Sequence, residues 1–296
     1  GQVRLAGLHP EQMHTAWAAN PLNGHIQAQA VDARTVAIQA ALTGESPLGK
    51  NTNGLRWDKL HLQGQWQAAL WQIEALEIQA ADAKLQAQFT YQPQTASAQG
   101  QVEWQLPGMK AQAKGLLAPQ QGQGHIDIAM SDAALSMAWL KRWPGWAERL
   151  QGGQVSGPAQ LNAQWQGGYR QADTTVQLRM TLPRWAAQSQ STDGWQLQQG
   201  QVSVQGRMQA LQADMETRWR GAGQSLLIQS KASATSTALW GGSWHGQIQS
   251  ATAQMSSPQS TVPWKAQLQE AVGWQWSSTD HIAAAQWQAG RIAVQG

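Results

Sequence analysis

The chain has 296 residues and a formal net charge of +3, and only 12% of its residues are charged, about half the share of roughly 25% that soluble domains carry. The 18 tryptophans and the low charge exclude a disordered chain, which needs high charge and few aromatic residues. The absence of cysteine excludes disulfides and thiolate sites. The scattered Lys and Arg argue against nucleic-acid binding. The lack of any apolar run of about 18 residues argues against a membrane-spanning helix.

The N-terminal part predicts a strand, a short helix and a second strand. Residues 1–8 alternate between apolar and polar types, which indicates a strand. A helix is predicted near residues 10–19, because Pro10 suits the first helical position and Met13 and Trp17 lie four residues apart on one helix face. The alternation then resumes.

Residues 34–130 predict strands only. Apolar residues recur at every second position, and turn residues separate the runs. The alternation changes phase between Ile73 and Leu76, which predicts a tight turn or a β-bulge at that point.

Residues 131–165 predict a helix followed by a strand, and they form the one long interruption in the series of strands. Ser131 or Asp132 can cap the helix. Pro144 predicts a kink or two short helices within residues 132–150. The spacing predicts one apolar stripe on the helix, made of Leu135, Trp139, Trp143, Trp146 and Leu150. From residue 176 to 294 the strand pattern resumes.

Nearly every predicted strand has one apolar and one polar face, which is typical of an antiparallel sheet with one face in water. About fourteen strands at roughly 4.8 Å spacing would make a sheet about 65 Å wide, and such a sheet must curl or fold on itself. We predict an all-β fold, with a long curled antiparallel or mixed sheet that forms an elongated half-pipe groove with one or two short helices. The chain, residues 1–296, is predicted to be a single elongated segment with helical insertions near 10–19 and 132–150.

The apolar face would line this groove. Its tryptophans can be core residues or a ligand surface, and their shared phase with Leu and Ile favours the core. In a groove that does not close, however, the core face and the ligand face are the same surface. The predicted lining residues are Leu62, Trp66, Leu85, Phe89, Trp104, Ile128, Trp165, Leu178, Met180, Val204, Met215, Trp219, Ile228, Trp264 and Leu268.

The residue types that carry catalysis are sparse and far apart. The pair His9 and His14 superficially resembles a zinc helix, but Glu11 is misplaced for the usual pattern. No pair of carboxylates marks a glycosidase, and no glycine-rich phosphate loop follows a strand. We therefore expect no catalytic residue, no metal and no cofactor, and we do not expect an enzyme.

The residues around the central helix resemble those of a known family. Three stretches carry the resemblance: Ile126-Asp127-Ile128-x-Met130-Ser131-Asp132, the helix with Pro144, and Leu150-x-x-Gly153-x-Val155-x-Gly157-x-x-x-Leu161-x-Ala163-x-Trp165. They resemble the TamB family of translocation and assembly subunits. This family belongs to the wider AsmA-like group of Gram-negative bacteria. The first helix is followed by Leu22-x-Gly24-x-Ile26, which resembles the same unit.

The resemblance implies a long sheet folded lengthwise into a half-pipe with an apolar interior. It implies a periplasmic protein, anchored in the inner membrane at one end and bound to an outer-membrane barrel similar to TamA at the other. The implied function is to carry phospholipid between the membranes, to support assembly of outer-membrane proteins, or both. The expected partners are therefore phospholipid acyl chains, the TamA-like barrel and the membranes at the ends of the full-length chain, and we interpret these residues as an interior fragment.

Two other classes fit the alternation. A carbohydrate-binding or adhesive β-solenoid would also be rich in Gln and Thr, but it would show a repeat of fixed length and asparagine ladders, and Asn is rare in this chain. An outer-membrane barrel would gather its aromatic residues at two rims, whereas the sequence places Trp in mid-strand as often as at strand ends.

Overall fold

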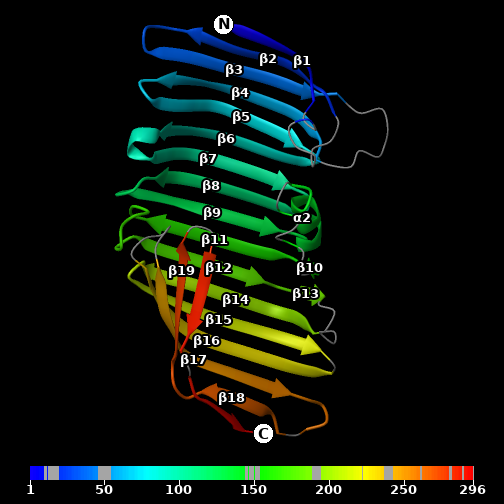
Figure 1. Cartoon of the computed structure of the whole chain (residues 1–296). Helices are drawn as coiled ribbons and strands as arrows, with labels where there is room; N and C mark the ends of the chain where they lie inside the picture. The colour runs from blue at the N-terminus through cyan, green and yellow to red at the C-terminus, as the bar shows by residue number, and fades with distance from the viewer. Residues whose placement is uncertain are drawn as a thin grey trace. The chain divides into compact units, whose positions relative to one another are not determined.

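The computed structural model describes residues 1–9, 12, 20–45, 55–143, 146, 150, 154–188, 195–221, 223–236, 243–260, 262–279, 282–288 and 290–295. Strands make up 71% of the described residues, and the 21 strands found among them belong to one antiparallel sheet that is not closed into a barrel (Figure 1). The predicted all-β class is therefore confirmed. In the described ranges, no helix has the length and apolarity needed to cross a membrane.

The chain divides into two compact units. Unit 1 comprises Gly1–Leu116 and Asp132–Gly152, and unit 2 comprises Leu117–Ser131 and Gly153–Gly296. The single segment expected over residues 1–296 stays a prediction. Of the two expected helical insertions, the one near residues 10–19 lies, apart from Gln12, outside the described residues. The one near 132–150 contains the helix α2 (Ala133–Leu140).

Unit 1 is built from consecutive antiparallel hairpins. Each strand from β1 to β6 pairs with the next strand in sequence. The phase change at Ile73 is a bulge in β5, as the sequence predicts, because the register to β6 shifts between Ile73 and Leu76. The strands are β1 (Gln2–Leu8), β2 (Leu22–Ala30), β3 (Thr35–Gly44), β4 (Trp57–Gln67), β5 (Leu70–Ala80), β6 (Ala83–Gln92), β7 (Ser97–Leu106) and β8 (Met109–Leu117), with a 3₁₀ turn η1 (Pro93–Thr95) between β6 and β7.

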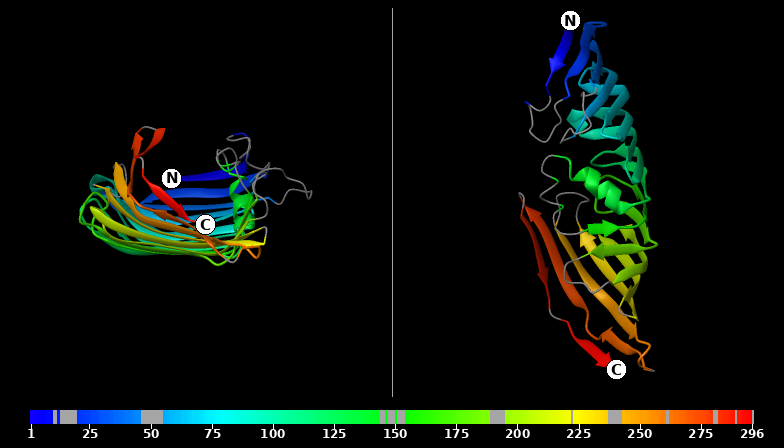
Figure 2. Two further views of the ribbon diagram at one scale, coloured as in Figure 1. Left: turned by 90° about the horizontal axis from the view of Figure 1, so that it is seen from below. Right: turned by 90° about the vertical axis from the view of Figure 1, so that its right-hand side faces the viewer.

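Helix α2 packs against the apolar side of unit 1 (Figure 2). Asp132 caps it as predicted, since its Oδ1 accepts a 2.9 Å hydrogen bond from the Ala134 amide. The predicted stripe is wrong at Leu135, which is 53% exposed, and at Trp146, which is 46% exposed, whereas Ala133, Ser136 and Trp139 are the buried residues of α2.

Helix α2 buries a different face from the predicted one because its first turn lies close to the turn between β7 and β8. The Ser136 hydroxyl donates to the Pro107 carbonyl at 3.1 Å, and the Asp132 amide donates to the Gly108 carbonyl at 3.3 Å. Only small side chains fit where the helix backbone lies so near another backbone segment, so Ala133 and Ser136 face the sheet.

Unit 2 continues the antiparallel pattern. Its strands are β9 (Gly122–Met130), β10 (Gln154–Ser156), β11 (Ala159–Gln166), β12 (Thr175–Leu182), β13 (Trp185–Gln188), β14 (Gln196–Arg207), β15 (Ala210–Gly221), β16 (Gln224–Ser236), β17 (Trp244–Ser256), β18 (Trp264–Leu268), β19 (Val272–Thr279), β20 (Ile282–Trp287) and β21 (Ile292–Gln295). Strand β11 lies between β9 and β12, and β12 pairs in turn with β14.

The sheet of unit 2 forks at β17. The first part of this strand, Trp244–Ile248, pairs with β19, and the later part, Thr252–Met255, pairs with β18. Each branch gains one further strand, because β19 pairs with β20 and β18 pairs with β21 (Figure 1). One edge of β17 therefore pairs with two different strands, β18 and β19.

Backbone hydrogen bonds connect neighbouring turns at one end of the unit 2 strands. The Met208 amide donates to the Thr174 carbonyl at 2.9 Å, and the Ser236 amide donates to the Met208 carbonyl at 2.8 Å. Met208 and Thr174 are fully buried. These bonds pair backbone groups that would otherwise lack partners in the turns.

Candidate functional site

Cross-strand register aligns the apolar residues of unit 1 into rows that run from strand to strand. Leu62 of β4 faces Leu76 of β5, which faces Ala87 of β6, which faces Val102 of β7. Parallel rows on the same face are Leu60–Ile78–Leu85–Trp104, Gly64–Ile73–Phe89–Gly100 and Trp66–Trp71–Tyr91–Ala98. From β5 to β7 every residue on this face is aliphatic, aromatic or glycine.

The five lining residues predicted in this unit all fall on this apolar face. They are Leu62, Trp66, Leu85, Phe89 and Trp104. The residues that the predicted set omits, such as Trp71, Ile73 and Tyr91, alternate in the same phase, and the phase shift at the β5 bulge is the signal that places Ile73 beside Phe89.

Unit 2 has a corresponding apolar face. Ile128 faces Leu161, Leu161 faces Met180, and Met180 faces Val202, which faces Met215. A second row passes from Ala163 through Leu178 and Val204 to Ala213. The ten predicted lining residues of this unit share the face: Ile128, Trp165, Leu178, Met180, Val204, Met215, Trp219, Ile228, Trp264 and Leu268.

These faces are partly open to solvent among the described residues. Trp66 is 38% exposed, Trp71 and Tyr91 39%, and Met215 and Trp264 36%. Soluble monomers rarely expose a contiguous apolar patch of more than a few hundred Å², and larger patches mark binding surfaces. An apolar face without charges can hold hydrocarbon but cannot perform acid–base chemistry.

The position of tryptophan differs from the sequence-based expectation. All but one of the tryptophans in the described strands lie within two residues of a strand end rather than in mid-strand, namely Trp57, Trp66, Trp71, Trp104, Trp165, Trp185, Trp219, Trp244, Trp264, Trp274 and Trp287. The alternation shows which face a residue occupies, but the strand ends depend on the turns. The aromatic residues therefore flank the aliphatic centre of each face.

The opposite face of unit 1 is polar and carries the main ion pairs. Glu77 accepts from Lys59 at 2.8 Å and lies 3.3 Å from the Lys84 ammonium. The hydrogen bond from Lys59, aided by one from Gln79, lowers the pKa of Glu77 to about 2.

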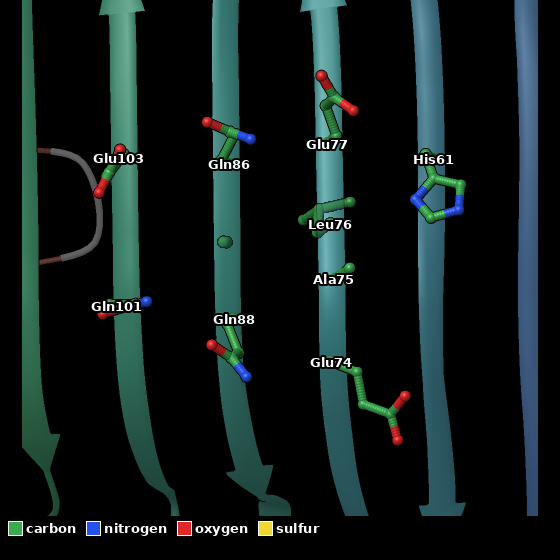
Figure 3. Close-up of a pocket in the computed structure, with 10 residues that line it drawn as sticks. His61, Glu74, Ala75, Leu76, Glu77, Gln86, Gln88, Gln101 and Glu103 are labelled. Carbon is green, nitrogen blue, oxygen red and sulfur yellow. The ribbon is translucent and has the colours of Figure 1, made fainter.

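A shallow depression of about 300 Å³ lies beside this ion pair (Figure 3). Its lining includes His61, Glu74, Glu77, Gln88 and Glu103, whose side chains project on the polar side of the sheet. A similar depression in unit 2 is lined by polar residues such as Gln201, Asp214 and Lys231. In the part of the chain that is described, no group of His, Asp or Glu has the arrangement of a metal site.

Comparison with known proteins identifies no relative of this chain. No family model, no curated protein sequence and no solved structure matches the chain.

Proposed function

We propose that this chain is part of a periplasmic protein whose apolar face carries phospholipid acyl chains between the inner and outer membranes, supports assembly of outer-membrane proteins, or does both. The observation that carries the proposal is the set of cross-strand apolar rows on one face of each unit, partly exposed and without charge, from β5 to β7 in unit 1 and across β11, β12 and β14 in unit 2.

The free energy of hydrocarbon transfer explains why such a face is useful. Each CH₂ group exposed to water costs about 0.8 kcal/mol, so a 16-carbon chain costs about 13 kcal/mol. A face of continuous rows keeps the chain in apolar contact as it moves from one strand to the next. Passage then needs an unbroken lining and no catalytic group.

The cellular setting follows from the resemblance of the central unit to the TamB family. On that basis the full-length protein is anchored in the inner membrane of a Gram-negative bacterium, and its partner is an outer-membrane barrel similar to TamA. Phospholipid is the cargo that agrees with the apolar rows.

Site-specific photo-crosslinking tests this function. A photoreactive amino acid at Leu178, on the apolar face, should capture phospholipid in the periplasm. The same photoreactive amino acid in place of Gln177, the adjacent residue on the opposite face, should capture no phospholipid. Equal capture at both positions, or none at Leu178, would refute the proposal.

Carbohydrate binding is the second candidate function. The polar depressions beside Glu77 and Asp214 favour it, because glutamine, glutamate and serine side chains can bind hydroxyl groups. Neither depression has an aromatic residue in its described lining, so a sugar ring has no stacking partner there. Binding of the purified chain to glycan but not to lipid would favour this function.

A further inference from the structure

The two edges of the apolar face in unit 1 differ in construction. On one edge α2 covers the face, and Trp139 is only 3% exposed. Its ring lies 6.1 Å from that of Trp104 and 5.6 Å from that of Trp143, and Trp143 lies 6.2 Å from Trp57. Four indoles thus close this edge.

The opposite edge is open. Trp66, Trp71 and Tyr91 lie directly opposite one another on β4, β5 and β6, each within two residues of a strand end. Each is 38–39% exposed. Among the described residues, no protein group accepts a hydrogen bond from the indole N–H of Trp66 or Trp71 or from the Tyr91 hydroxyl.

The centre of the face offers no polar group between these edges. The two central rows contain Leu62, Leu76, Ala87 and Val102, and then Gly64, Ile73, Phe89 and Gly100. An amphiphile can therefore bury its hydrocarbon in the centre and meet exposed hydrogen-bond donors at the open edge, where Trp66, Trp71 and Tyr91 lie. Trp and Tyr are suited to such a boundary because one end of each ring system is apolar and the other is wet.

The open edge is also neutral. Residues 65–72 and 90–95, which flank it, include no Lys, Arg, Asp or Glu. On the neighbouring strand, β3 begins after Asp32 and Arg34, one charge of each sign. Neutral donors bind ester and phosphate oxygens without selecting the charge of the head group.

We propose that unit 1 holds a glycerolipid in one orientation, with its acyl chains on the central rows and its ester and head-group oxygens at the edge formed by Trp66, Trp71 and Tyr91. The α2 edge is closed to the head group. This inference rests on the proposed function and specifies how the same face presents its ligand.

Two photoreactive phospholipids test the orientation in the purified 296-residue chain, one with a diazirine in an acyl chain and one with a diazirine on the head group. The chain probe should label peptides that contain Phe89 or Leu76. The head-group probe should label the peptide around Trp66 and Trp71 and spare α2.

A set of conservative variants tests the hydrogen bonds separately from the hydrophobic surface. Replacing Trp66, Trp71 and Tyr91 together by Phe keeps an aromatic ring at each position and removes the donors. Phospholipid binding should weaken by about two- to tenfold for each lost hydrogen bond, whereas hexadecane binding should weaken much less, by the smaller apolar area of Phe alone. Trp143→Phe, at the closed edge and outside the predicted lining, is the matched control and should leave the ratio of the two affinities unaltered.

The possible failures are distinct. If the chain probe labels nothing, the proposed function is wrong. If the chain probe labels the central rows but the head-group probe labels α2 as strongly as the open edge, only the orientation is wrong. If the triple variant weakens hexadecane and phospholipid binding equally, the edge acts as plain hydrophobic surface and the inference is overturned.

Discussion

The indole Nε1 of Trp139 donates a 2.8 Å hydrogen bond to the carbonyl oxygen of Ala81, 58 positions earlier in the chain. Both residues are 3% exposed. Ala81 and Asp82 form the turn between β5 and β6 with φ angles of 49° and 70°, a conformation that is costly for residues with a side chain. The bond therefore joins α2 to a turn whose conformation needs support from its surroundings.

Trp139→Phe should lower the free energy of unfolding by about 1–3 kcal/mol, because the buried Ala81 carbonyl loses its donor while most of the ring packing remains. Urea denaturation followed by circular dichroism measures the change. Trp287→Phe is the control, since Trp287 is 66% exposed and its replacement should change stability by less than about 0.5 kcal/mol. Equal effects of the two changes would contradict this role of Trp139.

The turn between β4 and β5 offers a stabilising change. Ala68 and Ala69 have φ angles of 47° and 70°, a pair of values for which two-residue hairpin turns favour Asn-Gly. Ala69→Gly should raise the free energy of unfolding by about 0.5–1 kcal/mol, because glycine adopts positive φ without a steric penalty. Ala87→Gly, in the middle of β6, should do the reverse. A loss of stability on Ala69→Gly would show that the turn is not strained.

Two glycines with nearly the same φ angle allow the backbone cost of a Gly→Ala change to be measured separately from the cost of steric contact with a neighbouring segment. Gly108 has a φ of 79°, and a Cβ added there would lie 2.3 Å from the Asp132 carbonyl oxygen, at the start of α2. Gly223 has a φ of 77° and open space around it. Gly223→Ala should cost about 1 kcal/mol from the backbone alone, and Gly108→Ala should cost more and detach α2. Thermal unfolding with tryptophan fluorescence measures both effects, and similar costs would show that the contact with Asp132 is unimportant.

The polar face gives a pH prediction. The pKa of Glu77 is lowered to about 2 from a usual value of 4.5, chiefly by the hydrogen bond from Lys59. A carboxylate with a lowered folded-state pKa stabilises the fold above its unfolded pKa, and this stabilisation is lost as the pH falls from about 4.5 to about 2. Because the ion pair is at the surface, solvent limits it to about 1 kcal/mol or less. The difference in stability between wild type and Glu77→Gln should shrink over that pH range, and a constant difference would exclude the ion pair as its cause.

Alternation of residue types predicts the face of each side chain but not its partner. Moving a strand by two residues keeps every apolar residue on the same face, so the sequence indicates the apolar rows without fixing which residues meet. For the same reason the fork at β17 could not be foreseen, because Trp244–Ser256 alternates with one bulge along its length and nothing in that pattern divides its edge between β18 and β19. The position of α2 depends on backbone contact with the turn at Gly108, which the spacing of Leu135 and Trp139 does not encode.

A single charge on the apolar face gives the most direct test of lipid passage. Met180 lies in the row between Leu161 and Val202, and the next residue, Thr181, lies on the polar face opposite Gln160 and Gln201. Met180→Arg should reduce the lipid that co-purifies with the chain at least tenfold, because an unpaired charge in contact with hydrocarbon costs several kcal/mol. Thr181→Arg introduces the same charge at the adjacent position and should leave the lipid content unchanged. Native mass spectrometry counts the bound lipid, and circular dichroism shows whether both variants fold. If Met180→Arg folds and retains its lipid, the apolar rows of unit 2 are not the path of the acyl chains.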